Sequence, residues 1–410
     1  MSTRAPVFDE LVGDEQVFFR EYFDRMPLLR RAAIQGDVRE VLRAEDLDEL
    51  LHRESLRLPY VSIFGRESSY QVSRLIHGKP VTDCVAPERV HEHFLSGATI
   101  QWYSMNHFFP NLRELTSMLA RKFASRSEVI AFLSAAGAKE SAGCHQDPVD
   151  LFIIQVEGTK NWKVWVPRKG EPTSHEPDEL GEPLIDTDLA PGDVLYMPYG
   201  TPHLVSSKNA MSLHLSVAVK PRKWSELLID IVGDIVNGDA AFRGFPYLDE
   251  QLSDEQADTL ERLAGLLAER IALIDPKARL QQLARAGRDA AVPSNGHVFG
   301  DAAGIDRAQK TTGFKRGPAE VLFGDTDDGT CTLEIRKTTS ASMDGKVEHS
   351  IRRTRIKVPE KIAAGLRHMT EGDILTAEDV FPVGDAERSL EVAKSLARMD
   401  ILQPVRLPSR

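Results

Sequence analysis

The chain has 410 residues, of which 41% are hydrophobic and 28% charged, with a net charge of -11. This length exceeds a single typical core, so two or three domains are expected. No stretch approaches the roughly 18 apolar residues of a membrane-spanning helix, and residues 1–15 lack the apolar segment of a secretory signal, which predicts a cytoplasmic protein. The acidic balance disfavours nucleic acid as the main partner. Three widely spaced cysteines indicate neither a disulfide framework nor a zinc knuckle.

The first 220 residues change from helical to β-rich patterns. Aromatic residues recur at helical spacing from Phe18 to Phe23, and Pro27 should end that helix. An amphipathic helix is predicted over residues 111–123. From residue 129 onward, short apolar runs alternate with turn signals, which is typical of a barrel or sandwich. Strands are predicted at 151–156, 161–166, 194–197 and 211–219, with a tight hairpin at Gly158.

Residues 224–285 are predicted to be helical. Ser253 and Gln256 occupy capping-box positions before an apolar stripe. That stripe faces either the core of the chain or a dimer interface, and the pattern leaves both readings open. Its members are Leu260, Leu263, Leu267, Ile271 and Ile274.

The remaining residues predict a second, smaller domain. Residues 291–315 are rich in Gly, Ala and Asp, and predict a linker. Beyond it, β runs at 330–336 and 349–358, helical patterns at 360–370 and 386–399, and a last β run at 401–405 fit a small α+β domain of winged-helix type. The basic residues between Arg352 and Lys357 are interpreted as a solvated strand face rather than a phosphate-binding stripe.

The segment from Gly143 to Pro167 contains the candidate metal ligands. His145 and Asp147 are two residues apart, so on a strand they project from one face and can reach one ion. His203, after a later strand and a proline-bracketed loop, can supply a second imidazole. Two histidines and one carboxylate suit non-haem iron(II) with open coordination positions. H-x-D alone is a weak signal, since a surface turn produces it as readily.

Lys160 follows the hairpin and shares strand parity with Trp162, Val164 and Val166. If that face is the barrel interior, Lys160 is an inward cation that needs an anionic partner. The alternative is a solvated turn lysine. A dicarboxylic acid that chelates the iron at one end and pairs with Lys160 at the other accounts for all four residues together.

The motif block resembles the Jumonji-C oxygenases of the cupin superfamily, and most closely their ribosomal oxygenase branch. Members have H-x-D followed by F-I-L-Q-L-E-G-x-K/R-x-W. This chain has His145-Gln146-Asp147 and then FIIQVEGTKNW, from Phe152 to Trp162. The resemblance implies that His145, Asp147 and His203 hold Fe(II) and act as the catalytic centre. It places Lys160 and Ser216 on the co-substrate, 2-oxoglutarate.

The same resemblance implies an α+β fold with a double-stranded β-helix (jelly-roll or cupin) core and flanking helices. It divides the chain into an oxygenase domain over residues 1–222, with its catalytic core at about 90–222, a helical dimerisation region at 223–290, the linker at 291–315, and a winged-helix-like domain at 316–410. The implied activity is hydroxylation of an amino-acid side chain in a peptide or protein with dioxygen, by a homodimer.

The chain departs from the family where substrate binds. The usual Asn-x-Tyr falls on Ala131-Phe132-Leu133, a substrate-contact serine falls on Ala218, and Pro-Pro before the motif is Gly143-Cys144. A ribosomal protein substrate is therefore open to question. The alternatives are hydroxylation of a free amino acid or small metabolite, and a non-catalytic cupin scaffold. A zinc hydrolase leaves Lys160 without a purpose.

Three further residues are competing candidates for the cavity. His214 shares parity with Ser216, so a place in the cavity as a substrate contact is one alternative for it, and a metal ligand in place of His203 is a weaker one. Trp102 and Tyr103 either line the pocket or pack in the core.

Overall fold

The computed structural model describes residues 4–53, 56–64, 71–76, 78–138, 143–170, 173–208, 210–246, 254–291, 298–317, 319–343, 346–369, 373–382 and 384–405. The chain divides into two compact units, residues 1–292 and 293–410. Each unit has its own hydrophobic core. Among the described residues, no helix combines the length and the hydropathy that crossing a bilayer requires.

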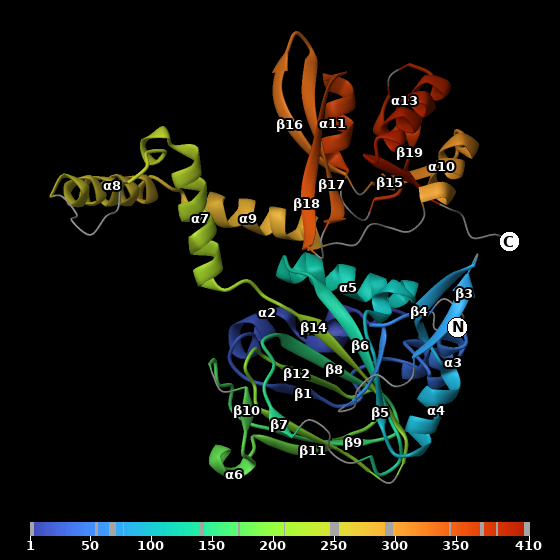
Figure 1. The fold of residues 1–410 in the computed structure, drawn as a ribbon. Helices are drawn as coiled ribbons and strands as arrows, with labels where there is room; N and C mark the ends of the chain where they lie inside the picture. Colours follow the sequence, from blue (N-terminus) through green and yellow to red (C-terminus); the bar gives the residue numbers. More distant parts are fainter. Residues whose placement is uncertain are drawn as a thin grey trace. The chain divides into compact units, whose positions relative to one another are not determined.

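Two antiparallel sheets build the first unit (Figure 1). The seven-stranded sheet has the order β1 (Leu28–Arg30), β12 (Val194–Met197), β8 (Asp150–Glu157), β14 (Ser212–Val219), β6 (Ser127–Ser134), β5 (Thr99–Trp102), β2 (Val61–Ile63). The five-stranded sheet has the order β10 (Ser174–His175), β7 (Cys144–His145), β13 (His203–Ser207), β9 (Lys160–Val164), β11 (Ile185–Leu189). A separate hairpin pairs β3 (Gln71–Ile76) with β4 (Lys79–Val85).

The core of this unit lies on both faces of β8. Phe152 and Ile154 pack among residues of the surrounding helices, whereas Leu151 and Ile153 cluster with Trp162 of the other sheet. Because side chains alternate along a strand, an unbroken apolar run indicates burial on both faces. The strands predicted at 151–156, 161–166, 194–197 and 211–219 correspond to β8, β9, β12 and β14.

Short helices accompany these sheets. They are α1 (Phe8–Val12), α2 (Glu15–Val17), the π-helix η1 (Phe18–Tyr22), the 3-10 turns η2 (Val38–Glu40) and η3 (Met105–His107), α3 (Ala44–Leu51), α4 (Pro87–Leu95), α5 (Pro110–Phe123) and α6 (Pro177–Leu180). The first aromatic helix ends at Tyr22 rather than at Pro27. Asp24 has a φ of 59°, a left-handed conformation that a helix cannot continue through.

The helical region that follows comprises α7 (Trp224–Gly238), η4 (Ala240–Phe242), α8 (Asp254–Ala272) and α9 (Pro276–Ala291). The apolar stripe on α8 is not buried within the chain, because Leu260 is 70% exposed and Ile271 43%. On α7, Trp224 and Ile229 are exposed as well. The predicted cap at Ser253 lies outside the described residues.

The second unit has two three-stranded antiparallel sheets with helices. Its elements are α10 (Val298–Arg307), β15 (Gly313–Arg316), β16 (Glu320–Asp327), β17 (Thr330–Met343), β18 (Lys346–Pro359), α11 (Glu360–His368), β19 (Leu375–Thr376), α12 (Ala377–Val380), α13 (Ala386–Arg398) and β20 (Leu402–Pro404). The sheets have the orders β19-β15-β20 and β16-β17-β18. The range 291–315, expected as a linker, holds α10. Ile305 of α10 and Ala308, which follows the end of that helix, are buried in this core. The winged-helix assignment and the boundary at residue 222 stay predictions.

Candidate active site

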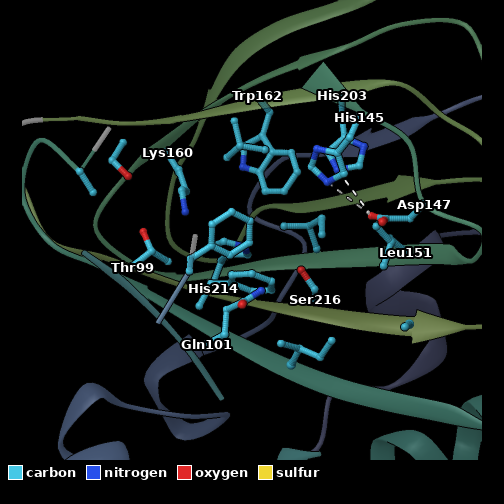
Figure 2. A pocket seen from close by; sticks show the side chains of 18 of the residues that line it. Thr99, Gln101, His145, Asp147, Leu151, Lys160, Trp162, His203, His214 and Ser216 are labelled. Atoms are coloured by element: carbon cyan, nitrogen blue, oxygen red, sulfur yellow. Dashed lines mark ion pairs between the residues drawn. The ribbon is translucent and has the colours of Figure 1, made fainter. Parts of the chain in front are cut away.

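A cavity of about 290 Å³ lies in the first unit and is lined by residues of both sheets. Figure 2 shows His145, Asp147 and His203 at one end, and Lys160 and Thr99 at the other. Trp162 lies between the two ends, and Leu151 lies beside Asp147. The volume is near the lower limit of the roughly 300 Å³ to 1,000 Å³ typical of small-molecule sites.

The three candidate metal ligands converge although they come from distant parts of the sequence. His145 ends β7 and His203 begins β13, and the two residues are direct partners across these antiparallel strands. Asp147 follows two residues later and places its Oδ2 atom 3.9 Å from His145 Nε2 and 3.7 Å from His203 Nε2. One donor atom from each residue lies within 4.8 Å of the other two. The predicted triad is therefore assembled as a single cluster.

The other nitrogen of each imidazole is held by a backbone carbonyl. His145 Nδ1 lies 3.1 Å from Gly143 O, and His203 Nδ1 lies 3.0 Å from Thr201 O. A carbonyl only accepts, so each Nδ1 carries the proton and donates it. The lone pair is then on Nε2, which faces Asp147. This is the usual way in which proteins orient metal-binding histidines.

Burial keeps His203 neutral. Its side chain is buried, and burial together with the neighbouring His145 lowers the pKa of His203, while Asp147 acts in the opposite direction. A neutral ring is the form that donates a lone pair to a metal.

Lys160 occupies the opposite end of the cavity. Residues of β9 alternate between buried and partly exposed, so Lys160, Trp162 and Val164 point inward as predicted. The exception is Val166, which lies beyond the end of the strand and is 54% exposed. Lys160 Nζ donates to Ser134 Oγ at 2.8 Å, and Ser134 also accepts from Thr99 Oγ1 at 2.9 Å.

Lys160 has no carboxylate partner within the described part of the chain. Its side chain is 6% exposed, and burial lowers its pKa to about 8. The ammonium form still predominates at pH 7. Among the described residues, this buried cation bonds only to a hydroxyl, so an anionic ligand would complete its interactions.

The face of β14 adds further residues to the cavity. Ser216 is buried and lines it, and its contact with the co-substrate stays a prediction. His214 also lines it but is outside the metal-ligand cluster: its ring stacks on Phe132, with centroids 4.9 Å apart. Burial, followed by the charge of Lys160, lowers the pKa of His214. The cluster contains His203 and not His214, so the alternative in which His214 replaces His203 is wrong.

Ala131 and Leu133, which stand where the family has Asn and Tyr, belong to the hydrophobic core and the residues packed against it. Phe132, between them, lines the cavity. Alternate residues of β6 share one face, as strand geometry requires. On that face, Ile130 and Phe132 line the cavity and Ser134 bonds to Lys160. Trp102 packs in the core.

Sequence reasoning missed Thr99, Gln101 and Ser134. Thr99, Gln101 and Tyr103 stand at every second position, and this alternation indicates that they share one polar face of a strand. Their place in the cavity depends on the pairing of β5 with β6, which local patterns do not give.

Comparison with known families now adds to this geometry. The sequence matches the JmjC domain family over residues 105–227, the stretch that contains all three candidate ligands and Lys160. Residues 105–227 are a JmjC domain. The predicted cupin-type core of antiparallel sheets with helices is therefore confirmed.

Relatives match beyond the JmjC domain. Ribosomal oxygenase 2 of Mus musculus is 30% identical over 285 residues, which is 63% of this chain and 58% of that protein. The bifunctional lysine-specific demethylase and histidyl-hydroxylase NO66 of Dictyostelium discoideum is 32% identical over 230 residues, 54% of this chain and 43% of that protein. The chain thus spans less than two thirds of the length of either relative.

A solved structure has a similar fold over nearly the whole chain. YcfD, a ribosomal oxygenase from Escherichia coli determined with cobalt and 2-oxoglutarate, gives a TM-score of 0.51 at 18% identity. The similarity covers 94% of this chain and 97% of that chain. At this identity the likeness shows the fold.

Proposed function

We propose that the chain is an Fe(II)- and 2-oxoglutarate-dependent oxygenase that hydroxylates an amino-acid side chain within a peptide or protein. One observation carries the proposal: the His145, Asp147 and His203 cluster and the buried ammonium of Lys160 line one cavity. The JmjC domain match covers the same residues.

The donor set fits iron(II). Two imidazoles and one carboxylate supply three ligands and leave further positions for a co-substrate and dioxygen. The carbonyls of Gly143 and Thr201 fix the ring orientations before any metal arrives. When bound, iron(II) with 2-oxoglutarate and dioxygen supplies an oxidative decarboxylation that yields succinate and carbon dioxide and transfers one oxygen atom to a C–H bond.

The protein side chains bind and shield the reactants. Lys160, with Ser134 beside it, binds the distal carboxylate of 2-oxoglutarate. Ser216 contacts the same co-substrate from β14, and Trp162 covers the cavity from the facing strand β9. The apolar lining excludes water from the reacting atoms.

The relatives support the reaction class and suggest a protein substrate. They are named ribosomal oxygenase and histidyl-hydroxylase, and the structure of YcfD was determined with 2-oxoglutarate. Ala218, which replaces a substrate-contact serine expected from the resemblance, lines the cavity here, and so does Phe132, the residue between the two replaced Asn-x-Tyr positions. The residue that this chain hydroxylates can therefore differ from the one that its relatives hydroxylate.

The test is succinate release from 2-oxoglutarate with Fe(II) and ascorbate. The wild-type chain should release succinate without added substrate, and His145→Ala should not. His91→Ala, which changes an exposed histidine of α4, is the matched control. A wild-type chain that neither turns over 2-oxoglutarate nor binds Fe(II) contradicts the proposal. A mass gain of one oxygen atom in a peptide screen then identifies the substrate.

A free amino acid or small metabolite is the second candidate substrate. The cavity volume of about 290 Å³ favours it, because this space suits a small molecule. The same mass-gain screen, run with free amino acids beside peptides, separates the two candidates.

We also propose that residues 223–290 form a homodimer interface, and that the protein is cytoplasmic. The interface proposal is supported by apolar side chains that the chain leaves uncovered: Trp224, Leu228 and Ile229 on α7 are between 56% and 70% exposed. Exposed apolar groups of this size are typical of interfaces. Light scattering should give twice the chain mass for the wild type and the single mass for Leu228→Asp combined with Ile229→Asp. A monomeric wild type contradicts the proposal.

A further inference from the structure

Gln101 lines the cavity on the sheet that faces His145 and His203. Its side-chain oxygen Oε1 accepts hydrogen bonds from Ser62 Oγ and from the Tyr103 hydroxyl, each at 3.0 Å. Ser62 is the direct cross-strand partner of Gln101, and Tyr103 lies two residues further along the chain. Both lone pairs of Oε1 are therefore occupied.

The amide nitrogen of Gln101 remains available for a ligand. Among the described residues, Nε2 has no hydrogen-bond partner. A carboxamide whose oxygen is saturated presents two N–H donors and no acceptor. Such a group is complementary to a carbonyl oxygen, and an aromatic surrounding strengthens the hydrogen bond by lowering the local dielectric. Phe132, the cross-strand neighbour of Gln101, also lines the cavity and supplies that surrounding.

The charges of the cavity favour a peptide over a free amino acid as the substrate. A free amino acid brings a carboxylate, which calls for a cation. Lys160 is the only Lys or Arg among the described lining residues, and it lies with Ser134 at the end assigned to 2-oxoglutarate. The neutral amide of Gln101 suits an uncharged peptide group instead.

We propose that Gln101 recognises a main-chain carbonyl of the substrate, and that Ser62 and Tyr103 position it for this role. Gln101 is then a determinant of specificity for a peptide over a free amino acid. This inference rests on the proposed oxygenase function.

The experiment uses the full chain with Fe(II), 2-oxoglutarate and ascorbate. Two sets of probes are added: the N-acetyl N′-methylamides of the standard amino acids, and the same amino acids in free form. The readout is succinate release with a probe divided by the uncoupled release of the same variant, so that a change in basal turnover cancels. We expect the best capped amino acid to give a higher ratio than its free form.

Gln101→Glu tests the donor directly. Glutamate has the same shape and still accepts from Ser62 and Tyr103, but it presents an acceptor where the amide presents donors. The ratio should fall about tenfold. A purely structural role for Gln101 predicts no change. Gln282→Glu, on α9 outside the cavity lining, is the matched control for the added charge.

The positioning role has its own variant. Ser62→Ala combined with Tyr103→Phe frees the amide to rotate, so the probe concentration for half-maximal stimulation should rise by about threefold. The inference is overturned if Gln101→Glu keeps a ratio within about twofold of wild type, or if free amino acids stimulate as strongly as capped ones, or if neither does. A wild-type chain without uncoupled succinate release is a separate result, which overturns the oxygenase function itself.

Discussion

Lys160 Nζ lies 2.8 Å from Ser134 Oγ, inside the cavity that His145 and His203 also line. The ammonium and the metal-ligand cluster are therefore available to the two ends of one small molecule. The proposed function therefore makes the affinity for 2-oxoglutarate dependent on the protonation of Lys160.

We expect the KM for 2-oxoglutarate to rise about tenfold between about pH 7 and about pH 9. Burial lowers the pKa of Lys160 to about 8, so the ammonium is present below this pH and is lost above it. The measurement is uncoupled succinate release over this range. Lys160→Arg, which stays charged throughout, should show no such rise. A flat wild-type profile would show that Lys160 does not bind the co-substrate.

Asp147→Asn should weaken Co(II) binding by more than about 100-fold, since even indirect partners of metal ligands alter affinity by roughly 10- to 100-fold. The neutral amide removes the charge that faces His145 Nε2 and His203 Nε2. Calorimetric titration of the full chain with Co(II) measures the change. Asp178→Asn on α6, an exposed carboxylate, should leave the affinity at the wild-type value. Equal affinities for Asp147→Asn and wild type would exclude Asp147 as a ligand.

Asp150 makes the stability of the first unit depend on pH. Its carboxylate is 1% exposed and accepts from the Tyr196 hydroxyl at 2.7 Å and from Tyr199 N at 2.8 Å. Burial outweighs these hydrogen bonds and raises the pKa of Asp150 to about 6. The folded state therefore binds this proton more tightly than the unfolded state does. The resulting stabilisation is complete below about pH 4 and is lost as the pH rises through about 6.

The prediction concerns the difference in unfolding free energy between wild type and Asp150→Asn, which carries no ionisable group at this position. Wild type should gain roughly 2 kcal/mol relative to the variant between about pH 7.5 and about pH 4.5. Urea unfolding followed by tryptophan fluorescence at both pH values measures this gain. A difference that does not change with pH would place the titration of Asp150 near its ordinary value.

Gly158→Ala should destabilise the chain by at least about 2 kcal/mol. Gly158 has a φ of +62°, and a Cβ there lies 2.0 Å from the backbone oxygen of Met211. Gly36→Ala is the matched control, because Gly36 has a φ of +74° with nothing within 4 Å of a Cβ. Thermal unfolding should therefore show a larger loss of Tm for Gly158→Ala. Equal losses would mean that the neighbouring strand moves aside.

Local motifs were sufficient to predict that His145 and Asp147 lie together and that Lys160 points inward. His145 and Asp147 are two residues apart, and Lys160 follows Gly158 in a hairpin, so short-range alternation and turn chemistry are sufficient for them. His203 was predicted from its place after a strand and a proline-bracketed loop, and the family resemblance pointed to the same residue. Its pairing with His145 is a property of the folded sheet.

The polar residues opposite them could not be predicted in the same way. Gln101 reaches the cavity because β5 pairs with β6, placing Gln101 opposite Phe132, and β6 in turn places Phe132 opposite His214. The register between strands far apart in sequence depends on the whole fold. The stripe on α8 was ambiguous for a related reason: periodicity shows which face is apolar, but not what covers it.

The pairing of β9 with β13 fixes the distance between His203 and Lys160 along the sheet. His203 lies opposite Val164 and Ser207 lies opposite Lys160, so four strand residues, about 13 Å, separate the ligand from the lysine along the sheet. No loop intervenes, and hydrogen bonds between the strands keep that span constant. Gln101 and Phe132 lie on the other sheet, so substitutions there leave this span unchanged. Under the proposed function, the length of the co-substrate is therefore set independently of the residues that contact the substrate.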